Sequence, residues 1–146
     1  MRQETIIKTY LQFSELTDKQ KEKIIDKNYD INVSDEFWYE YLHEEFENKL
    51  KSLGFYKIEI YFSGFSSQGD GACFSAKHKR GDVDTSGRYS HSNTMRSDND
   101  LILKVGRRLA DKYYRQLNKE YDRLTSDQAI IETIENNEIE FDKDNI

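Results

Sequence analysis

The chain has 146 residues, a net charge of −6, and 36% hydrophobic, 34% charged and 13% aromatic residues. The length is typical of one domain with a real core, and the aromatic share argues against a disordered chain. The longest apolar runs are far shorter than the ~20 residues of a membrane span. The first eight residues lack the apolar core of a signal peptide, and the single Cys73 cannot form an internal disulfide. We therefore expect a cytosolic protein that does not enter a membrane.

The first third of the chain predicts a strand and two helices. Residues 5–13 are β-branched and aromatic, which is typical of a strand. Thr17 followed by Gln20 matches a capping box, so we expect a helix over residues 18–27. Ser34 is expected to cap a second helix, which Gly54 ends. The apolar stripe of this second helix comprises Phe37, Tyr41, Leu42, Phe46, Leu50 and Leu53, with Trp38 beside it.

The middle of the chain predicts a β-meander. Residues 55–62 alternate between apolar and polar side chains, as in a half-buried strand. Residues 72–78 form the next expected strand, and the glycine-rich segment between the two strands should reverse the chain. We expect residues 79–87 to be a charged connection and residues 88–95 to be the third strand.

The last third predicts the longest helix and a short one. Ser97 followed by Asp100 indicates the start of a helix over residues 98–123, and Thr125 with Gln128 indicates a second cap. The expected stripe of the long helix comprises Leu101, Val105, Leu109, Tyr113, Leu117, Tyr121 and Leu124.

Taken together, the elements predict a single α+β domain over residues 1–146. Residues 138–141 are expected to form an edge strand, and residues 142–146 a frayed tail. The expected architecture is one antiparallel sheet, made of the meander and the N-terminal strand, packed against several helices.

Charges are distributed unevenly along the chain. Acidic residues dominate the helix expected after Ser34 and the segment after residue 120, whereas the middle of the chain is basic. Such a separation is typical of solvated helix and strand faces, and it also fits an acidic surface for a basic partner. The candidate contacts are Glu40, Glu44, Glu45, Glu47, Glu132 and Glu135.

The glycine-rich segment offers the other candidate site. Gln68 and Asp70 lie in a loop shaped by glycines, and His91 lies on a strand that we expect to neighbour it. One hypothesis is an enzyme that acts on a nucleotide or small ligand, with Asp70 and His91 as acid and base and Ser63 or Ser67 as nucleophile. No Walker, nucleophile-elbow or zinc-ligand spacing supports it, so we expect no catalytic residue, cofactor or metal.

The hairpin carries a family resemblance. The segment Phe-Ser-Gly-Phe-Ser-Ser-Gln-Gly-Asp-Gly-Ala-Cys-Phe, residues 62–74, resembles the signature of a group of small proteins of bacteriophages and prophages. That signature usually has Trp where this chain has Ser66, and Ser where it has Cys73. Similar segments occur in order at residues 13–21, 89–95 and 125–141.

The resemblance implies a phage accessory protein. Such proteins commonly bind host machinery, and an anti-CRISPR protein that inhibits a Cas9-type nuclease by stoichiometric, charge-complementary binding in the host cytoplasm is the function we expect. The enzyme remains one alternative. A nucleic-acid-binding module using residues 77–80 with Arg107 and Arg108 is another, although the net charge of −6 argues against direct nucleic-acid binding.

Overall fold

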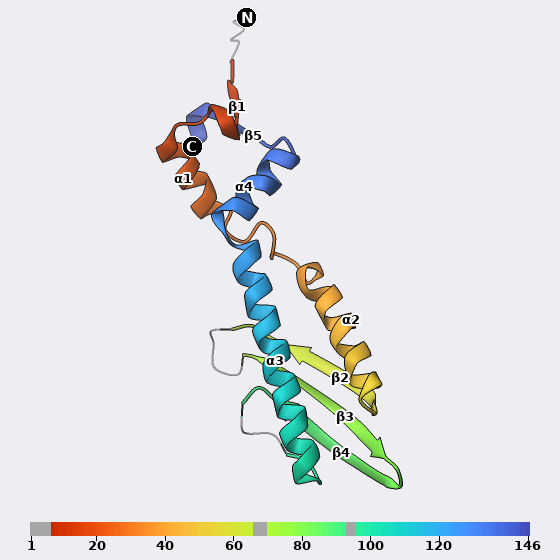
Figure 1. Ribbon diagram of the computed structural model, residues 1–146. Helices are drawn as coiled ribbons and strands as arrows, with labels where there is room; N and C mark the ends of the chain where they lie inside the picture. Colours follow the sequence, from red (N-terminus) through yellow and green to blue (C-terminus); the bar gives the residue numbers. More distant parts are fainter. Residues whose placement is uncertain (1–6, 66–69, 93–95) are drawn as a thin grey trace, which may run out of the picture. The chain divides into compact units, whose positions relative to one another are not determined.

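A computed structural model describes residues 7–65, 70–92 and 96–146. Helices and antiparallel strands together confirm the α+β class (Figure 1). The contacts form two compact units, and each is described by itself: the central unit, Glu36–Glu120, and the terminal unit, the chain up to Asp35 together with Tyr121–Ile146. In the described segments, every helix is too short or too polar to span a membrane.

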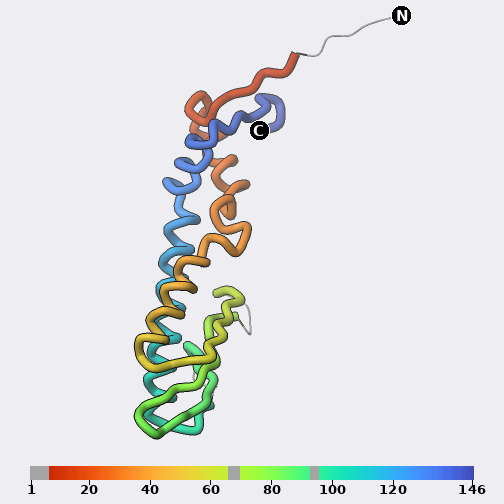
Figure 2. The backbone as a smooth tube through the Cα atoms, turned by 90° about the vertical axis from the view of Figure 1, so that its right-hand side faces the viewer, coloured from red at the N-terminus to blue at the C-terminus, as the bar shows by residue number. Residues whose placement is uncertain are grey.

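The terminal unit combines a two-stranded sheet with two short helices. β1 (Tyr10–Gln12) pairs antiparallel with β5 (Glu140–Asp142), so segments far apart in the sequence lie side by side (Figure 2). α1 (Asp18–Lys27) begins at the expected capping box. A 3-10 turn, η1 (Phe13–Glu15), follows β1. The core of this unit comprises Phe13, Leu16, Ile24, Ile130 and Ile134.

Three features of the terminal unit differ from the predictions made from the sequence. The N-terminal strand is shorter than expected and pairs in this separate sheet, because its partner β5 lies outside the meander. Ser126, not Thr125, caps α4 (Asp127–Asn136), since its Oγ accepts the backbone N–H of Ala129 at 3.3 Å. The expected frayed tail contains a second 3-10 turn, η2 (Lys143–Asn145).

The central unit contains the β-meander. β2 (Phe55–Phe62), β3 (Ala72–Arg80) and β4 (Val83–Ser90) form an antiparallel sheet in the order β2-β3-β4. The prediction of a charged connection and a later third strand was wrong. Instead, the chain turns at Gly81, whose φ of +60° suits glycine, and charged residues pair across the strands, with Lys79 opposite Asp84. Residues 93–95, assigned to the third strand, lie outside the described residues.

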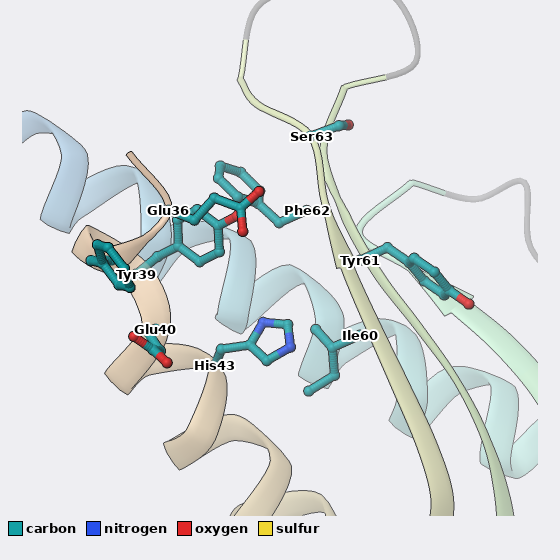
Figure 3. A pocket seen from close by; sticks show the side chains of 9 residues that line it. Glu36, Tyr39, Glu40, His43, Ile60, Tyr61, Phe62 and Ser63 are labelled. Carbon is teal, nitrogen blue, oxygen red and sulfur yellow. The ribbon is translucent and has the colours of Figure 1, made fainter. Parts of the chain in front are cut away.

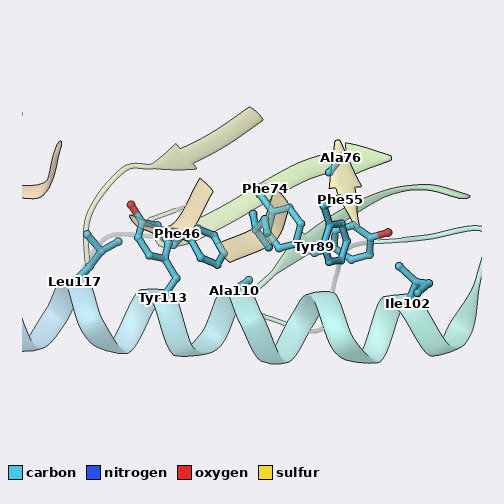
Figure 4. Close-up of a cluster of buried hydrophobic side chains, with 11 residues drawn as sticks. Phe46, Phe55, Phe74, Ala76, Tyr89, Ile102, Ala110, Tyr113 and Leu117 are labelled. Carbon is cyan, nitrogen blue, oxygen red and sulfur yellow. The ribbon is translucent and has the colours of Figure 1, made fainter. Parts of the chain in front are cut away.

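Two helices cover one face of this sheet (Figures 1 and 2). α2 (Phe37–Ser52) precedes β2, and α3 (Asp100–Leu124) follows β4. Their contact is aromatic, because the rings of Phe46 and Tyr113 stack at a centroid distance of 4.2 Å. Rings from the sheet complete the core (Figure 4). The core comprises Phe46, Leu50, Phe55, Ala72, Phe74, Ala76, Tyr89, Ile102, Ala110, Tyr113 and Leu117.

The buried stripe of α2 differs from the prediction. The helix begins at Phe37 without a side-chain cap, so Ser34 is not its cap. Phe37 is 75% exposed and Tyr41 48%, whereas Trp38 packs against the core. Two large rings one helical turn apart near the start of α2 thus remain accessible, which matters for the site described below.

The buried stripe of α3 also differs. Asn99, not Ser97, caps the helix, since its Oδ1 accepts from the backbone of Leu101 at 3.0 Å and of Ile102 at 3.2 Å. Leu101 is 57% exposed and Ile102 is buried. Gly106, next in the buried row, lets the ring of Tyr89 approach the helix backbone, because a Cβ at this position would overlap that ring.

Candidate functional site

A groove of about 540 Å³ runs between α2 and β2 in the central unit (Figure 3). Its volume lies within the range of binding sites for small ligands and short peptide segments. β2 is an edge strand of the meander, since it pairs only with β3 among the described strands. The groove is lined by Glu36, Phe37, Tyr39, Glu40 and His43 on the helix side, and by residues 60–63 on the strand side.

Packed aromatic rings form the floor of this groove. Tyr39 meets Phe62 edge to face at a centroid distance of 5.1 Å, and Trp38 meets both rings at 5.0 and 5.9 Å. His43 is held by its Nδ1, which lies 3.2 Å from the hydroxyl of the buried Tyr113. The floor is therefore rigid, because each of these rings contacts at least one other ring.

Carboxylates and an exposed ring form the rim. Glu36 and Glu40 lie one helical turn apart, and Phe37, which also lines the groove, has 75% of its surface exposed. Burial, and then the nearby Glu36, raises the pKa of Tyr39 above its ordinary value of 10.0, so its phenol stays protonated at neutral pH. The groove thus combines negative charge with aromatic surface, which suits an arginine or lysine side chain.

The structure brings only one of the acidic candidates into the groove. Glu40 lines it, while Glu44 and Glu45 are exposed further along α2. Glu47 lies 3.6 Å from Lys51, and this exposed pair contributes little to stability. The first two turns of α2 are therefore the best-formed part of the acidic surface.

The other two acidic candidates lie in the terminal unit. Glu132 and Glu135 are exposed on α4, where Glu132 accepts a hydrogen bond from Gln128 at 3.2 Å. Neither residue is among those that line the α2/β2 groove. Both remain candidates for contact with a partner.

The ends of the glycine-rich hairpin line a second hollow of about 470 Å³. Asp70 and His91 both line it, together with Ser63 and Arg88. The predicted proximity of the loop and His91 is therefore present. Gln68 and Ser67 lie outside the described residues.

His91 is held in the hairpin by the backbone and by a neighbouring ring. Its Nδ1 lies 3.3 Å from the N and 3.2 Å from the O of Ala72. Its ring stacks on Tyr114 at 4.1 Å and covers Gly71, where a Cβ would overlap it. These contacts give His91 a packing role in the hairpin.

Sequence reasoning missed the residues that form the α2/β2 groove. Phe37 was assigned to the buried stripe, and Tyr39 and His43 were given no role in a site. The spacing of Phe37 and Tyr41, two large rings four residues apart between glutamates, is the signal that was available. Only the orientation of α2 on the sheet shows that this face points outward.

A protein-family model described as a domain of unknown function (DUF8835) matches residues 38–82. The matched segment covers α2 from its second residue, β2 and β3, and it includes the groove residues other than Glu36 and Phe37. No curated protein and no solved structure matches the chain.

Proposed function

We propose that this chain is a protein-binding module that captures a basic segment of a partner protein at the α2/β2 groove. One observation carries the proposal: the groove places the carboxylates of Glu36 and Glu40 beside the exposed ring of Phe37 over a packed aromatic floor. Arginine and lysine side chains gain from both features, through charge and through cation–π contact. Aromatic anchors in a pocket are also the usual centres of protein interfaces.

The preferred partner is a host defence protein, and a Cas9-type nuclease is the specific proposal. The hairpin signature at residues 62–74 supports a phage context, and nucleic-acid-facing surfaces of such nucleases are basic. A module that covers such a surface inhibits by steric exclusion and needs no catalysis. The exposed acids that follow on α2, Glu44 and Glu45, extend the same charge complementarity.

Binding at the groove is tested with a defined probe. A fluorescein-labelled peptide of four Arg-Gly repeats is titrated with the full chain and followed by anisotropy. We expect Glu40→Lys to weaken binding at least tenfold. Asp82→Lys is the matched control, since it makes the same charge change on the exposed β3–β4 turn of the same unit.

Phe37→Ala distinguishes peptide binding at the groove from nonspecific electrostatic attraction of the peptide to an acidic protein. This change leaves the net charge at −6, and Phe37 is 75% exposed, so the fold should be unaffected. We expect a loss of about fivefold or more in peptide affinity, because the anchor ring is gone. Equal binding by Phe37→Ala and the unchanged chain would remove the groove as the docking site.

The nuclease proposal has its own experiment. The chain is mixed with Cas9 and guide RNA, resolved by gel filtration, and assayed for DNA cleavage. We expect co-elution and loss of cleavage near equimolar ratio, with inhibition relieved by Glu40→Lys. If cleavage is undiminished at molar excess and no complex forms, that nuclease is not the partner. The peptide titration still tests whether the groove binds a basic segment.

A further inference from the structure

A third concave surface, separate from the α2/β2 groove, lies beside α3 in the central unit and shares His91 with the hollow at the hairpin. It encloses about 510 Å³ and is lined by Lys104, Arg107, Arg108, His91 and Asp111; we call it the basic hollow. The three cations follow one another at intervals of three and one residues, and Lys104 and Arg108 lie one turn apart on the same helical face. A chain with a net charge of −6 thus concentrates positive charge at one place.

The cations of the basic hollow make no direct ion pair with the acidic side chains that the structure describes. Within the described part of the chain, no ion pair joins Lys104, Arg107 or Arg108 to an acidic side chain. Asp111, the acid of the hollow, is engaged with Arg115, whose Nε lies 3.1 Å from its Oδ2. The hollow therefore presents three positive charges, while the carboxylate of Asp111 pairs with Arg115.

His91 gives the hollow a rigid wall. Its ring is stacked on Tyr114 with an interplanar angle of 12°, and its Nδ1 is held by the backbone of Ala72. The Nε2 atom donates a hydrogen bond when Nδ1 accepts from the Ala72 N–H, and it accepts one when Nδ1 donates to the Ala72 carbonyl. Guanidinium and ammonium groups gathered on neighbouring turns of one helix are a common composition of sites for oxyanions.

We propose that the basic hollow binds a phosphate group carried by a nucleotide or by a nucleic-acid backbone. Guanidinium groups match phosphate oxygens in pairs, and a doubly charged phosphate is balanced by the three cations better than a single carboxylate is. The volume of about 510 Å³ admits a nucleotide-sized ligand. The remaining acidic charge of the chain has little effect at the hollow, because salt screens exposed charges beyond about 8–10 Å at physiological ionic strength.

Three probes distinguish the sources of the phosphate. Inorganic phosphate and ATP are titrated calorimetrically into the full chain at 50 mM salt, and a labelled 20-nucleotide oligothymidine is followed by anisotropy. Binding of ATP without the oligonucleotide assigns the hollow to nucleotides. Binding of the oligonucleotide, with affinity that falls steeply as salt rises, assigns it to a nucleic-acid backbone.

Paired variants decide whether the hollow is the site. Arg107→Gln combined with Arg108→Gln should weaken the binding of whichever probe binds at least tenfold. Lys112→Gln and Lys119→Gln combined, which remove the same number of charges from exposed positions of α3 outside the hollow, should change it less than twofold. Unfolding curves of both variants check the fold. The proposal is overturned if no probe binds up to 1 mM, or if both double variants weaken binding equally.

Discussion

Gly106 lies inside the longest helix, where its replacement by alanine ordinarily stabilises a protein. Alanine is favoured over glycine in a helix interior by about 1 kcal/mol. Here the opposite is expected, because a Cβ on Gly106 would overlap the ring of Tyr89. That ring has no room to move: it is 0% exposed, and Phe74 lies against it at a centroid distance of 4.9 Å.

The size of the effect follows from two opposing contributions. Overpacking a filled core costs about 1–3 kcal/mol, and this site should lie in the upper part of that range because the contact is with a ring fixed on several sides. Subtracting the gain of about 1 kcal/mol in helix propensity leaves a net destabilisation of about 1–2 kcal/mol for Gly106→Ala. In a chain of 146 residues, that lowers Tm by about 3–7 °C.

Thermal and urea unfolding, followed by near-UV circular dichroism, measure the change. Asn118→Ala is the control on the same helix, since Asn118 is exposed and should gain about 0.5 kcal/mol or less. Tyr89→Leu should reverse the sign of the Gly106→Ala effect, because it removes the ring that the new methyl group would meet. An increase in stability for Gly106→Ala in the otherwise unchanged chain would refute the reasoning.

Three further changes test other parts of the fold. Ser126→Ala should destabilise the chain by about 1 kcal/mol in urea unfolding, because it removes the cap of α4; a larger loss for Thr125→Ala would restore the cap expected from the sequence. Gly71→Ala should cost about 3 kcal/mol or more, since φ is +142° and the methyl group would overlap His91, and near-native stability would contradict the described hairpin. Burial raises the pKa of Tyr113 above 10.0, so the unfolded chain loses this proton first and the free energy of unfolding should fall above pH 10 by up to about 1.4 kcal/mol per pH unit. Tyr113→Phe should make that decline shallower in urea titrations between pH 9 and 11.5, and an unchanged slope would count against it.

The sequence predicted only some features of the candidate site. The acidity of α2 is evident from its glutamates, and the approach of Asp70 to His91 follows from the expected meander. The groove itself could not be predicted, because it depends on which face of α2 meets the sheet. A pattern with rings at Phe37, Trp38, Tyr39 and Tyr41 fits several rotations of the helix, and packing against Phe62 selects one.

The sequence by itself determined where some helices begin and end, because the residues that cap them lie within a few positions of those ends. The capping box of Thr17 and Gln20 begins α1, and Gly54, at a φ of +96°, follows the end of α2, because both depend on backbone groups close in sequence. Only the tertiary structure decided which residues of α3 are buried. On that face, the size of a side chain matters more than its hydrophobicity. Gly106 and Ala110 line the buried face of α3, with Leu101 outside, because the large ring of Tyr89 needs a small neighbour on the helix.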